Sequence, residues 1–365
     1  MNGPDLLLPG PVQAAPLPEV RNHTPYPSQY YQMLDTGDEV FHVIASRSTF
    51  DLARLDAQGV PQLAAEQAPL VRADQFHGQP NLSSCIQESD LAPFKPLCDV
   101  LLAHAIAHAP EGRPTRRWPV GLRIGRWEKI LAVTGPRFLE RTRQGWKLTE
   151  PDPALQVPLR WEHAFGGSCR WPLVPLEGQE PELQTHYDAN SIGCGWVDPE
   201  WLKKSRVADV DAPQIERWRQ PFDQAAAQGM DYRPEGVGVV GRWWIPRRQK
   251  AGTYDAQWKE SRWPRLPLDF DFAYWNAAPE DQQIEYPQGG EEVHLAGLQP
   301  GGGLMRFVLP GCMPFIRVRL HAGPILPRTM KLDTLIIDAK AMTLSCVHRM
   351  TLAARADVRV LEIVQ

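Results

Sequence analysis

Alternation of apolar and polar residues is the clearest structural pattern in this chain. Between positions 316 and 321, Ile, Val and Leu alternate with two Arg and a His. In residues 120–133, Val120, Leu122 and Ile124 alternate with Gly or Arg. A period of two places every second side chain on the same face of a strand, so the pattern predicts a strand at 316–321 and a strand pair at 120–133.

Other segments are predicted as strands by their content of β-branched and aromatic residues. The first is 39–52, EVFHVIASRSTFDL. The segments 333–352 and 358–365 form two or three further strands around a turn near 338–341. Residues 1–38 are Pro-rich and weakly patterned, and are expected to form an arm that lies on the surface or stays mobile.

Helical patterns are sparse. Residues 199–207 and 212–218 each fit about two helical turns, and 220–229 ends at a Gly suited to a helix C-terminus. The segments 150–200 and 260–315 are dominated by Pro, Gly and aromatic residues, which predicts loops ordered by packing. We therefore expect a mainly β fold with sandwich-like sheets, long ordered loops rich in Pro, Gly and Trp, and a few short helices.

Composition supports this fold class and argues against one class of function. The chain has 36 Pro in 365 residues, about twice the usual share, and Pro interrupts long helices. Its 39 Lys and Arg against 43 Asp and Glu give a net charge of −4, which argues against a nucleic-acid-binding surface.

No membrane-spanning or signal segment is recognisable, so we expect a cytoplasmic protein with no membrane partner. In that compartment the cysteines are expected as free thiols. They are Cys85, Cys98, Cys169, Cys194, Cys312 and Cys346. None belongs to a CxxC pair, so a zinc knuckle is not expected. We expect neither a bound metal nor a cofactor.

Residues 241–283 are the most distinctive part of the chain. Five of its thirteen Trp lie there, and five Arg fall within 242–265. Guanidinium groups pair with carboxylates and stack on aromatic rings. The block therefore predicts either a loop core fixed by buried ion pairs or a protein-binding face, because Trp and Arg dominate binding hot spots. We expect Arg242, Arg247 and Arg248 to pair with Asp255, Asp269 or Asp271.

Two local patterns imitate known sites. The run 236–241, GVGVVG, has the letters of a dinucleotide-binding loop, but Pro246 would interrupt the helix that such a loop needs. His104 and His108 have the spacing of two metal ligands on a helix, yet the segment fits a strand equally well. We interpret the first as a Gly-rich strand or turn, and the second as two half-buried histidines.

Carboxylates leave one enzymatic alternative open. Asp269 and Asp271, or Glu162, could act as acid and base in a β-rich hydrolase that cleaves a glycan or peptidoglycan polymer. Alternatively, Glu162 and His163 could supply the base that activates Cys169 as a thiol nucleophile. No Gly-x-Ser-x-Gly element is present, and nothing in the sequence fixes the geometry of these groups.

The block also resembles a known family, the DUF2169-type proteins encoded beside type VI secretion genes. The resemblance rests on RWWIPR at 242–247, GTYD at 252–255 with Trp258, RWPRLPLDF at 262–270 and NAAPEDQQ at 276–283. The segments SRSTFDL, FKPLCDV, PLRWEHAFGG and GGEEVHLAGLQPGG also fit, so that the likeness covers about residues 20–320. It departs at Ser191, where Pro is expected, and at His163, where Arg is expected.

The resemblance implies a non-catalytic adaptor or chaperone that loads a toxic effector onto the secretion spike. Its partner would be the effector, bound through a PAAR-like or N-terminal region, and the spike-tip protein of the VgrG type is a second candidate partner. The expected domains are the 1–38 arm, a β-rich domain at 39–320 and C-terminal strands at 321–365 packed on that same domain. Partner-binding candidates are Trp243, Trp244, Trp258, Trp263, Trp275, Arg247 and Arg248. The motif residues expected to be structural are Arg242, Gly252, Thr253, Tyr254, Asp255, Asp269 and Asp271.

Overall fold

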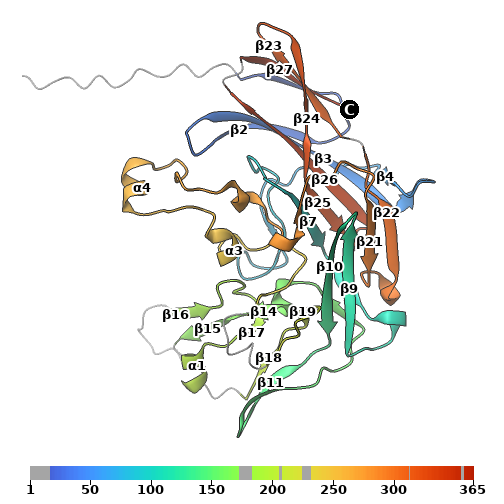
Figure 1. Ribbon diagram of the computed structural model, residues 1–365, viewed down its shortest axis with the longest axis vertical. Coiled ribbons are helices and arrows are strands. Elements are labelled where there is room, and N and C mark those ends of the chain that lie inside the picture. Colours follow the sequence, from blue (N-terminus) through green and yellow to red (C-terminus); the bar gives the residue numbers. More distant parts are fainter. Residues whose placement is uncertain (1–16, 172–182, 205–207, 224–231, 312, 355–356) are drawn as a thin grey trace, which may run out of the picture.

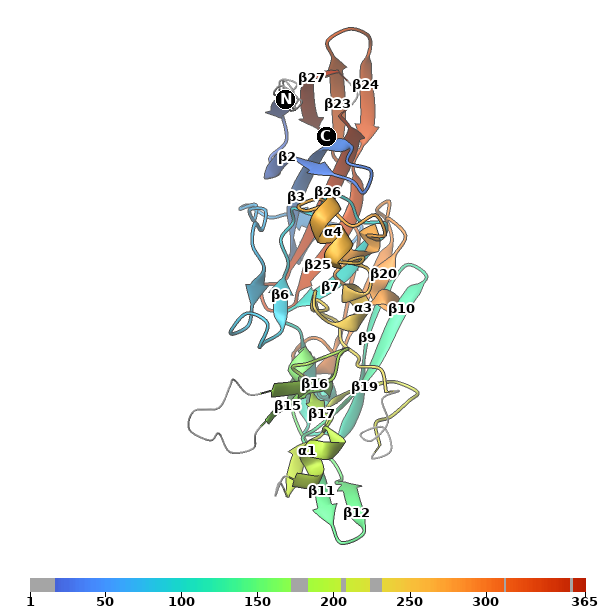
Figure 2. The ribbon, with the colours of Figure 1, turned by 90° about the vertical axis from the view of Figure 1, so that its left-hand side faces the viewer.

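The computed structural model describes residues 17–171, 183–204, 208–223, 232–311, 313–354 and 357–365. Within these ranges the chain is mainly β, with several sheets and a few short helices, which confirms the predicted fold class. The molecule is elongated, with the strands of residues 315–329 at one end and those of residues 138–148 at the other (Figures 1 and 2).

A seven-stranded sheet forms the centre. Its strands are, in spatial order, β2 (Ser28–Leu34), β3 (Val40–Leu55), β26 (Thr343–Ala353), β25 (Lys331–Asp338), β7 (Cys98–Ala103) and β20 (Gln283–Ile284), with β4 (Pro61–Leu63) also paired to β3. Neighbours are antiparallel, except that β25 runs parallel to β7. The C-terminal strands β25 and β26 thus lie in the middle of the sheet, between β3 and β7.

A five-stranded sheet covers one side of the central sheet and makes the fold sandwich-like (Figure 1). Its strands are β19 (Ile215–Arg217), β10 (Trp127–Thr134), β9 (Arg117–Ile124), β21 (Glu292–Ala296) and β22 (Leu304–Val308). Val120, Leu122 and Ile124 are buried in one core cluster with Val100 and Leu102 of β7. The predicted strand pair at 120–133 is confirmed as the β9–β10 hairpin.

A four-stranded sheet lies at the upper end of the molecule in Figure 1. It is formed by β1 (Glu19–Asn22), β27 (Val358–Val364), β23 (Phe315–Leu320) and β24 (Ile325–Thr329). Ile316 and Val318 are buried against Ile44 of the central sheet, while Arg319 pairs with Glu362, so the predicted strand is confirmed. The segment expected as an arm contributes β1 and β2 from Glu19 on, because each strand finds a backbone partner elsewhere in the chain.

Shorter strands complete the lower part and the loops. They are β5 (Gln75–Phe76), β6 (Cys85–Gln87), β8 (Ile106–His108), β11 (Phe138–Thr142), β12 (Gly145–Leu148), β13 (Gln156–Pro158), β14 (Phe165–Gly166), β15 (Ser168–Trp171), β16 (Leu183–His186), β17 (Cys194–Gly195) and β18 (Asp209–Asp211).

The helices of the described ranges are short. They are α1 (Pro199–Lys204), α3 (Ile245–Arg248) and α4 (Ala256–Ser261), with the 3-10 turns η1 (Pro110–Gly112), η2 (Trp161–His163), η3 (Phe272–Trp275), η4 (Glu280–Gln282) and η5 (Pro300–Gly302). None of these helices is long and apolar enough to cross a membrane.

Of the three predicted helices, α1 is present, although 205–207 lie outside the described residues. The prediction of a helix at 212–218 is wrong, because Ile215 is fully buried and pairs with Val133 as part of β19. In the third, 220–223 are not helical, and 224–229 lie outside the described residues.

Candidate partner-binding site

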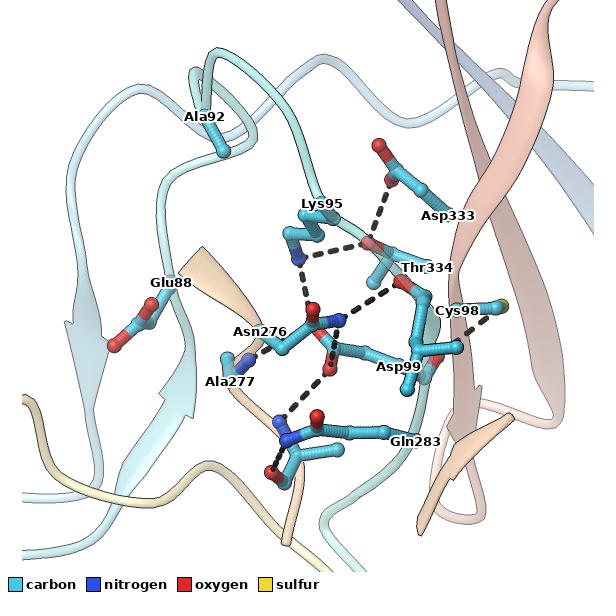
Figure 3. Close-up of polar contacts among 12 residues, drawn as sticks. Glu88, Ala92, Lys95, Cys98, Asp99, Asn276, Ala277, Gln283, Asp333 and Thr334 are labelled. Atoms are coloured by element: carbon cyan, nitrogen blue, oxygen red, sulfur yellow. Dashed lines mark hydrogen bonds and ion pairs between the residues drawn. The ribbon is translucent and has the colours of Figure 1, made fainter. Parts of the chain in front are cut away.

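A buried carboxylate fixes the end of the 241–283 block to the central sheet (Figure 3). Asp99 of β7 has no solvent exposure. Its oxygens accept hydrogen bonds from Lys95 Nζ at 2.7 Å, Asn276 Nδ2 at 3.0 Å, and the backbone N–H groups of Ala277 at 2.9 Å and Ala278 at 3.1 Å. A carboxylate that accepts this many donors holds the NAAP segment in one conformation.

The network continues from Lys95 across the sheet. Lys95 Nζ donates to Thr334 Oγ1 at 2.9 Å, and Thr334 Oγ1 donates to Asp333 Oδ1 at 2.9 Å. Asp333 Oδ2 in turn accepts a hydrogen bond from Arg349 Nε at 2.6 Å. Burial opposes the charge on Lys95, but Asp99 and then Asp333 outweigh it, so the pKa of Lys95 lies above its ordinary value.

A second buried node fixes the start of the block. The Glu88 carboxylate accepts hydrogen bonds from both terminal nitrogens of Arg247, at 2.5 and 3.1 Å, and from Arg242 Nε at 3.1 Å. Arg242 Nη2 also donates to Asp74 Oδ1 at 3.0 Å, and Arg248 lies 4.0 Å from Asp188. Burial by itself would raise the pKa of Glu88, but Arg247 outweighs it and the pKa is lowered.

The Arg side chains are therefore ion-paired, but the predicted partners are wrong. Asp255 instead caps α4 by accepting Trp258 N, and Asp271 accepts Ala273 N at the start of η3. Asp269 accepts the backbone N–H and the hydroxyl of Thr253 at 3.0 and 2.7 Å. The short side chain of an Asp near a turn accepts hydrogen bonds from the nearest backbone N–H groups. The guanidinium groups of the block therefore pair with acidic residues of distant loops.

Two of the candidate Trp belong to the loop core. Trp244 is buried and packs edge-to-face on Trp161, with ring centroids 5.3 Å apart. Trp275 is half-buried, with Arg242 6.0 Å from its ring centroid. Trp244 and Arg247 are therefore removed from the partner-binding candidates, since both side chains are buried.

Residues 251–271 form a projection from the body, which we call the α4 arm (Figure 1). The arm closes where Thr253 meets Asp269. Gly252 has φ +79°, and a Cβ there would come within 2.9 Å of Asp269 Oδ1. Trp258 Nε1 donates to Arg265 O at 2.9 Å, which joins α4 to the returning chain. These contacts make the arm a closed loop held by its own side chains.

The arm is tied to the turn between β2 and β3. Asp38 accepts Arg262 Nη2 at 3.0 Å and Arg265 Nη1 at 2.9 Å. Arg262 Nη2 also donates to Thr36 O at 3.0 Å. This clamp joins the arm to the edge of the central sheet.

The surface of the arm is aromatic. Trp258 lies between Tyr254 and Trp263, with centroid distances of 4.6 and 5.6 Å and edge-to-face geometry; we call these three rings the tip cluster. Trp263 is 68% exposed and Tyr254 is 52% exposed. Leu268 on the arm and Trp243 outside it are also largely exposed. Of the sequence candidates, Trp263, Trp258, Trp243 and Arg248 remain available to a partner.

Each carboxylate of the hydrolase alternative accepts a hydrogen bond from another group of the chain. Glu162 accepts Ser84 N at 2.8 Å, while Asp269 and Asp271 hold the turns described above. Burial raises the pKa of Cys169 and lowers that of His163, which opposes a thiolate and imidazolium pair.

A pocket that the sequence did not reveal brings two other carboxylates together. It has a volume of about 550 Å³ and is bordered by Trp218. Lys129 Nζ lies 3.4 Å from Glu235 and 2.9 Å from Asp281. Burial raises the pKa of Glu235 above its ordinary value. These residues come from four separate segments, so no local motif could have predicted the Lys129 pocket.

The described His and Cys residues that the sequence singled out lie in turns, strands and the core. His104 follows β7 in a turn with φ 50°, and its Nδ1 lies 2.9 Å from Asp338 Oδ2. His108 belongs to β8. No group of three or more His, Cys, Asp or Glu suited to a metal occurs in the part of the chain that the structure describes. The five described cysteines are free thiols, and Cys312 lies outside the described residues.

Comparison with known proteins gives a family and nothing further. A search of curated proteins and a search of solved structures found no significant match. The family model DUF2169, described as an uncharacterized protein conserved in bacteria, matches residues 36–349. Because that match covers most of the chain, this protein belongs to the DUF2169 family.

Proposed function

We propose that this chain is a non-catalytic adaptor or chaperone that binds a type VI secretion effector through the α4 arm and presents it to the spike. The observation that carries the proposal is the tip cluster, whose outer rings Tyr254 and Trp263 are exposed, on a projecting and internally fixed arm. The motif resemblance supplies the secretion context.

The physical argument is one of preorganisation. Aromatic anchors supply much of the energy of a protein interface, and rings already fixed in place lose little conformational entropy on binding. Trp258 is fixed by its hydrogen bond to Arg265 O and by the ring on each side, so it supports the exposed Trp263. A partner can therefore be held without any chemical change to it.

The proposed partner is an effector with a PAAR-like or N-terminal docking region, bound in the cytoplasm before secretion. The spike-tip protein of the VgrG type is the second protein that a loaded adaptor would meet. No nucleic acid or membrane has a part in this function.

The test is the capture of the neighbouring-gene effector by purified variants. Trp263→Ala is expected to weaken binding roughly thirtyfold, since a hot-spot Trp contributes at least about 2 kcal/mol. Trp218→Ala is the matched control, because Trp218 is also exposed but follows β19 in another part of the molecule. Circular dichroism verifies that both variants fold. Equal binding by the two variants would place recognition elsewhere and refute the proposal.

One observation favours the alternative, a hydrolase of glycan or peptidoglycan polymers. Glu235 and Asp281 both line the Lys129 pocket, and burial raises the pKa of Glu235, which suits the role of a general acid. Release of reducing ends from peptidoglycan, abolished in Glu235→Gln, would establish this activity. Its absence in the wild-type chain would exclude it for that substrate.

A further inference from the structure

A second pocket opens onto the buried network described above. It lies between the segment before β7, the β24–β25 connection and β26, and its volume is about 170 Å³. Its wall contains Phe94, Lys95, Tyr286, Arg328, Lys331 and Arg349. We call it the basic pocket. Figure 3 shows Lys95 and Asp333, which both border it, on either side of Thr334.

The charges of this pocket do not balance. Lys95, Arg328, Lys331 and Arg349 line it, with Asp333 as the only carboxylate among its lining residues. Asp99, which is not a lining residue, compensates Lys95, and Asp333 compensates Arg349. Four cations less these two carboxylates leave two positive charges, those of Arg328 and Lys331. Neither of these two makes an ion pair with any residue that the structure describes.

Aromatic rings hold one of the surplus cations at the pocket without neutralising it. The Lys331 ammonium lies 4.5 Å from the Tyr286 ring centroid and 6.0 Å from that of Phe94. A ring face attracts a cation but takes up none of its charge, so the ammonium remains available to an anion. Tyr286 donates its hydroxyl to Lys95 O at 2.5 Å. Burial raises the pKa of Tyr286 to about 12, which keeps this phenol neutral.

The buried side of the pocket adds to the positive potential. Arg349 directs Nε to Asp333 and Nη1 to the carbonyls of Asp90 and Ala92, but its buried Nη2 has no hydrogen-bond partner within the described ranges. Charges in a partly enclosed site are screened less than those at an open surface. The pocket therefore combines two fixed internal cations with two uncompensated ones at its edge.

We propose that the basic pocket binds a small oxyanion, a phosphate or a carboxylate. Its 170 Å³ corresponds to about six water molecules at about 30 Å³ each. That is below the roughly 300 Å³ of sites for drug-sized ligands, so the pocket fits inorganic phosphate or a short carboxylic acid better than a nucleotide. The proposal does not depend on the adaptor function.

Calorimetric titration tests the proposal with inorganic phosphate in one arm and citrate in the other, at low and at high NaCl. We expect at least one anion to bind with a Kd below about 1 mM, and high salt to weaken that binding. The better ligand of the two identifies the source of the oxyanion as phosphate or carboxylate. Binding of neither anion at low salt would overturn the proposal.

Lys331→Met removes the charge and keeps the aliphatic chain, so packing on Tyr286 is retained. We expect it to weaken anion binding at least tenfold, a change of about 1.4 kcal/mol. Lys340→Met is the matched control, because Lys340 is exposed in the turn at the other end of β25. Equal affinities in the two variants would place the bound anion outside this pocket and would also overturn the proposal.

Discussion

Asp99→Asn is the substitution that should destabilise this fold most clearly. It keeps the shape of the side chain but removes the charge that faces Lys95, whose side chain is only 8% exposed. Removal of one partner of a buried ion pair costs about 3–5 kcal/mol, because the other charge stays buried without compensation.

The new amide adds a second cost. The oxygens of Asp99 accept four donors, and the amide that replaces this carboxylate would turn its NH₂ group towards at least one of them. A buried donor without an acceptor costs about 1–3 kcal/mol. We therefore expect the free energy of unfolding to fall by at least about 3 kcal/mol, measured by urea unfolding with Trp fluorescence.

Asp255→Asn is the matched control for this prediction. The substitution is chemically the same, but Asp255 is an exposed N-cap, and Asn caps a helix about as well as Asp. The control should change the free energy of unfolding by less than about 0.5 kcal/mol. Asp99→Asn combined with Lys95→Met should cost less than the two single changes added together. A loss below about 1 kcal/mol for Asp99→Asn alone would refute the assigned role of the network.

Two further predictions concern pH and the Glu88 node. Burial lowers the pKa of His348 to about 4 from 6.5, so the unfolded chain binds the proton first as pH falls. The fold should lose about 3 kcal/mol between pH 6.5 and pH 4, and His348→Gln should remove this part of the pH dependence in urea unfolding. Glu88→Gln should cost about 3–5 kcal/mol at pH 7, because Arg247 stays buried without its carboxylate. Since the pKa of Glu88 is lowered on folding, its contribution is complete above pH 4.5 and lost in acid; a thermal melt at about pH 3 should therefore show a smaller difference between variant and wild type.

Period-two patterns were reliable where one face of a strand packs on a core. The strand at 316–320 and the hairpin at 117–134 follow directly from such alternation. The pattern fails at β19, where a three-residue strand inside a helix-compatible segment is decided by the pairing of Ile215 with Val133. A backbone partner about 80 positions away leaves no local signal, and the same holds for β1, which pairs with β27.

The partners of the block were beyond reach of the sequence for the same reason. Glu88 lies 154 positions from Arg242, and Asp99 lies 177 positions from Asn276. Sequence proximity suggested the Asp residues within the block, but those carboxylates already serve the nearest backbone N–H groups. Composition could indicate that the Arg side chains are paired, whereas only the topology decides with which acid.

Residues 241–283 therefore combine two kinds of residue in one stretch of sequence: buried polar residues that attach the block to the body, and exposed residues of the projecting arm. The buried polar residues, among them Arg247 and Asn276, attach both ends of the block to the body through Glu88 and Asp99. Between these attachments the chain projects, and Asp38 clamps the projecting part through two guanidiniums. A loop fixed at both ends and clamped in the middle loses little further conformational freedom on binding. The ring of Trp263 is largely exposed and so adds little to the stability of the fold, and the proposed adaptor function would account for its position through contact with a partner protein.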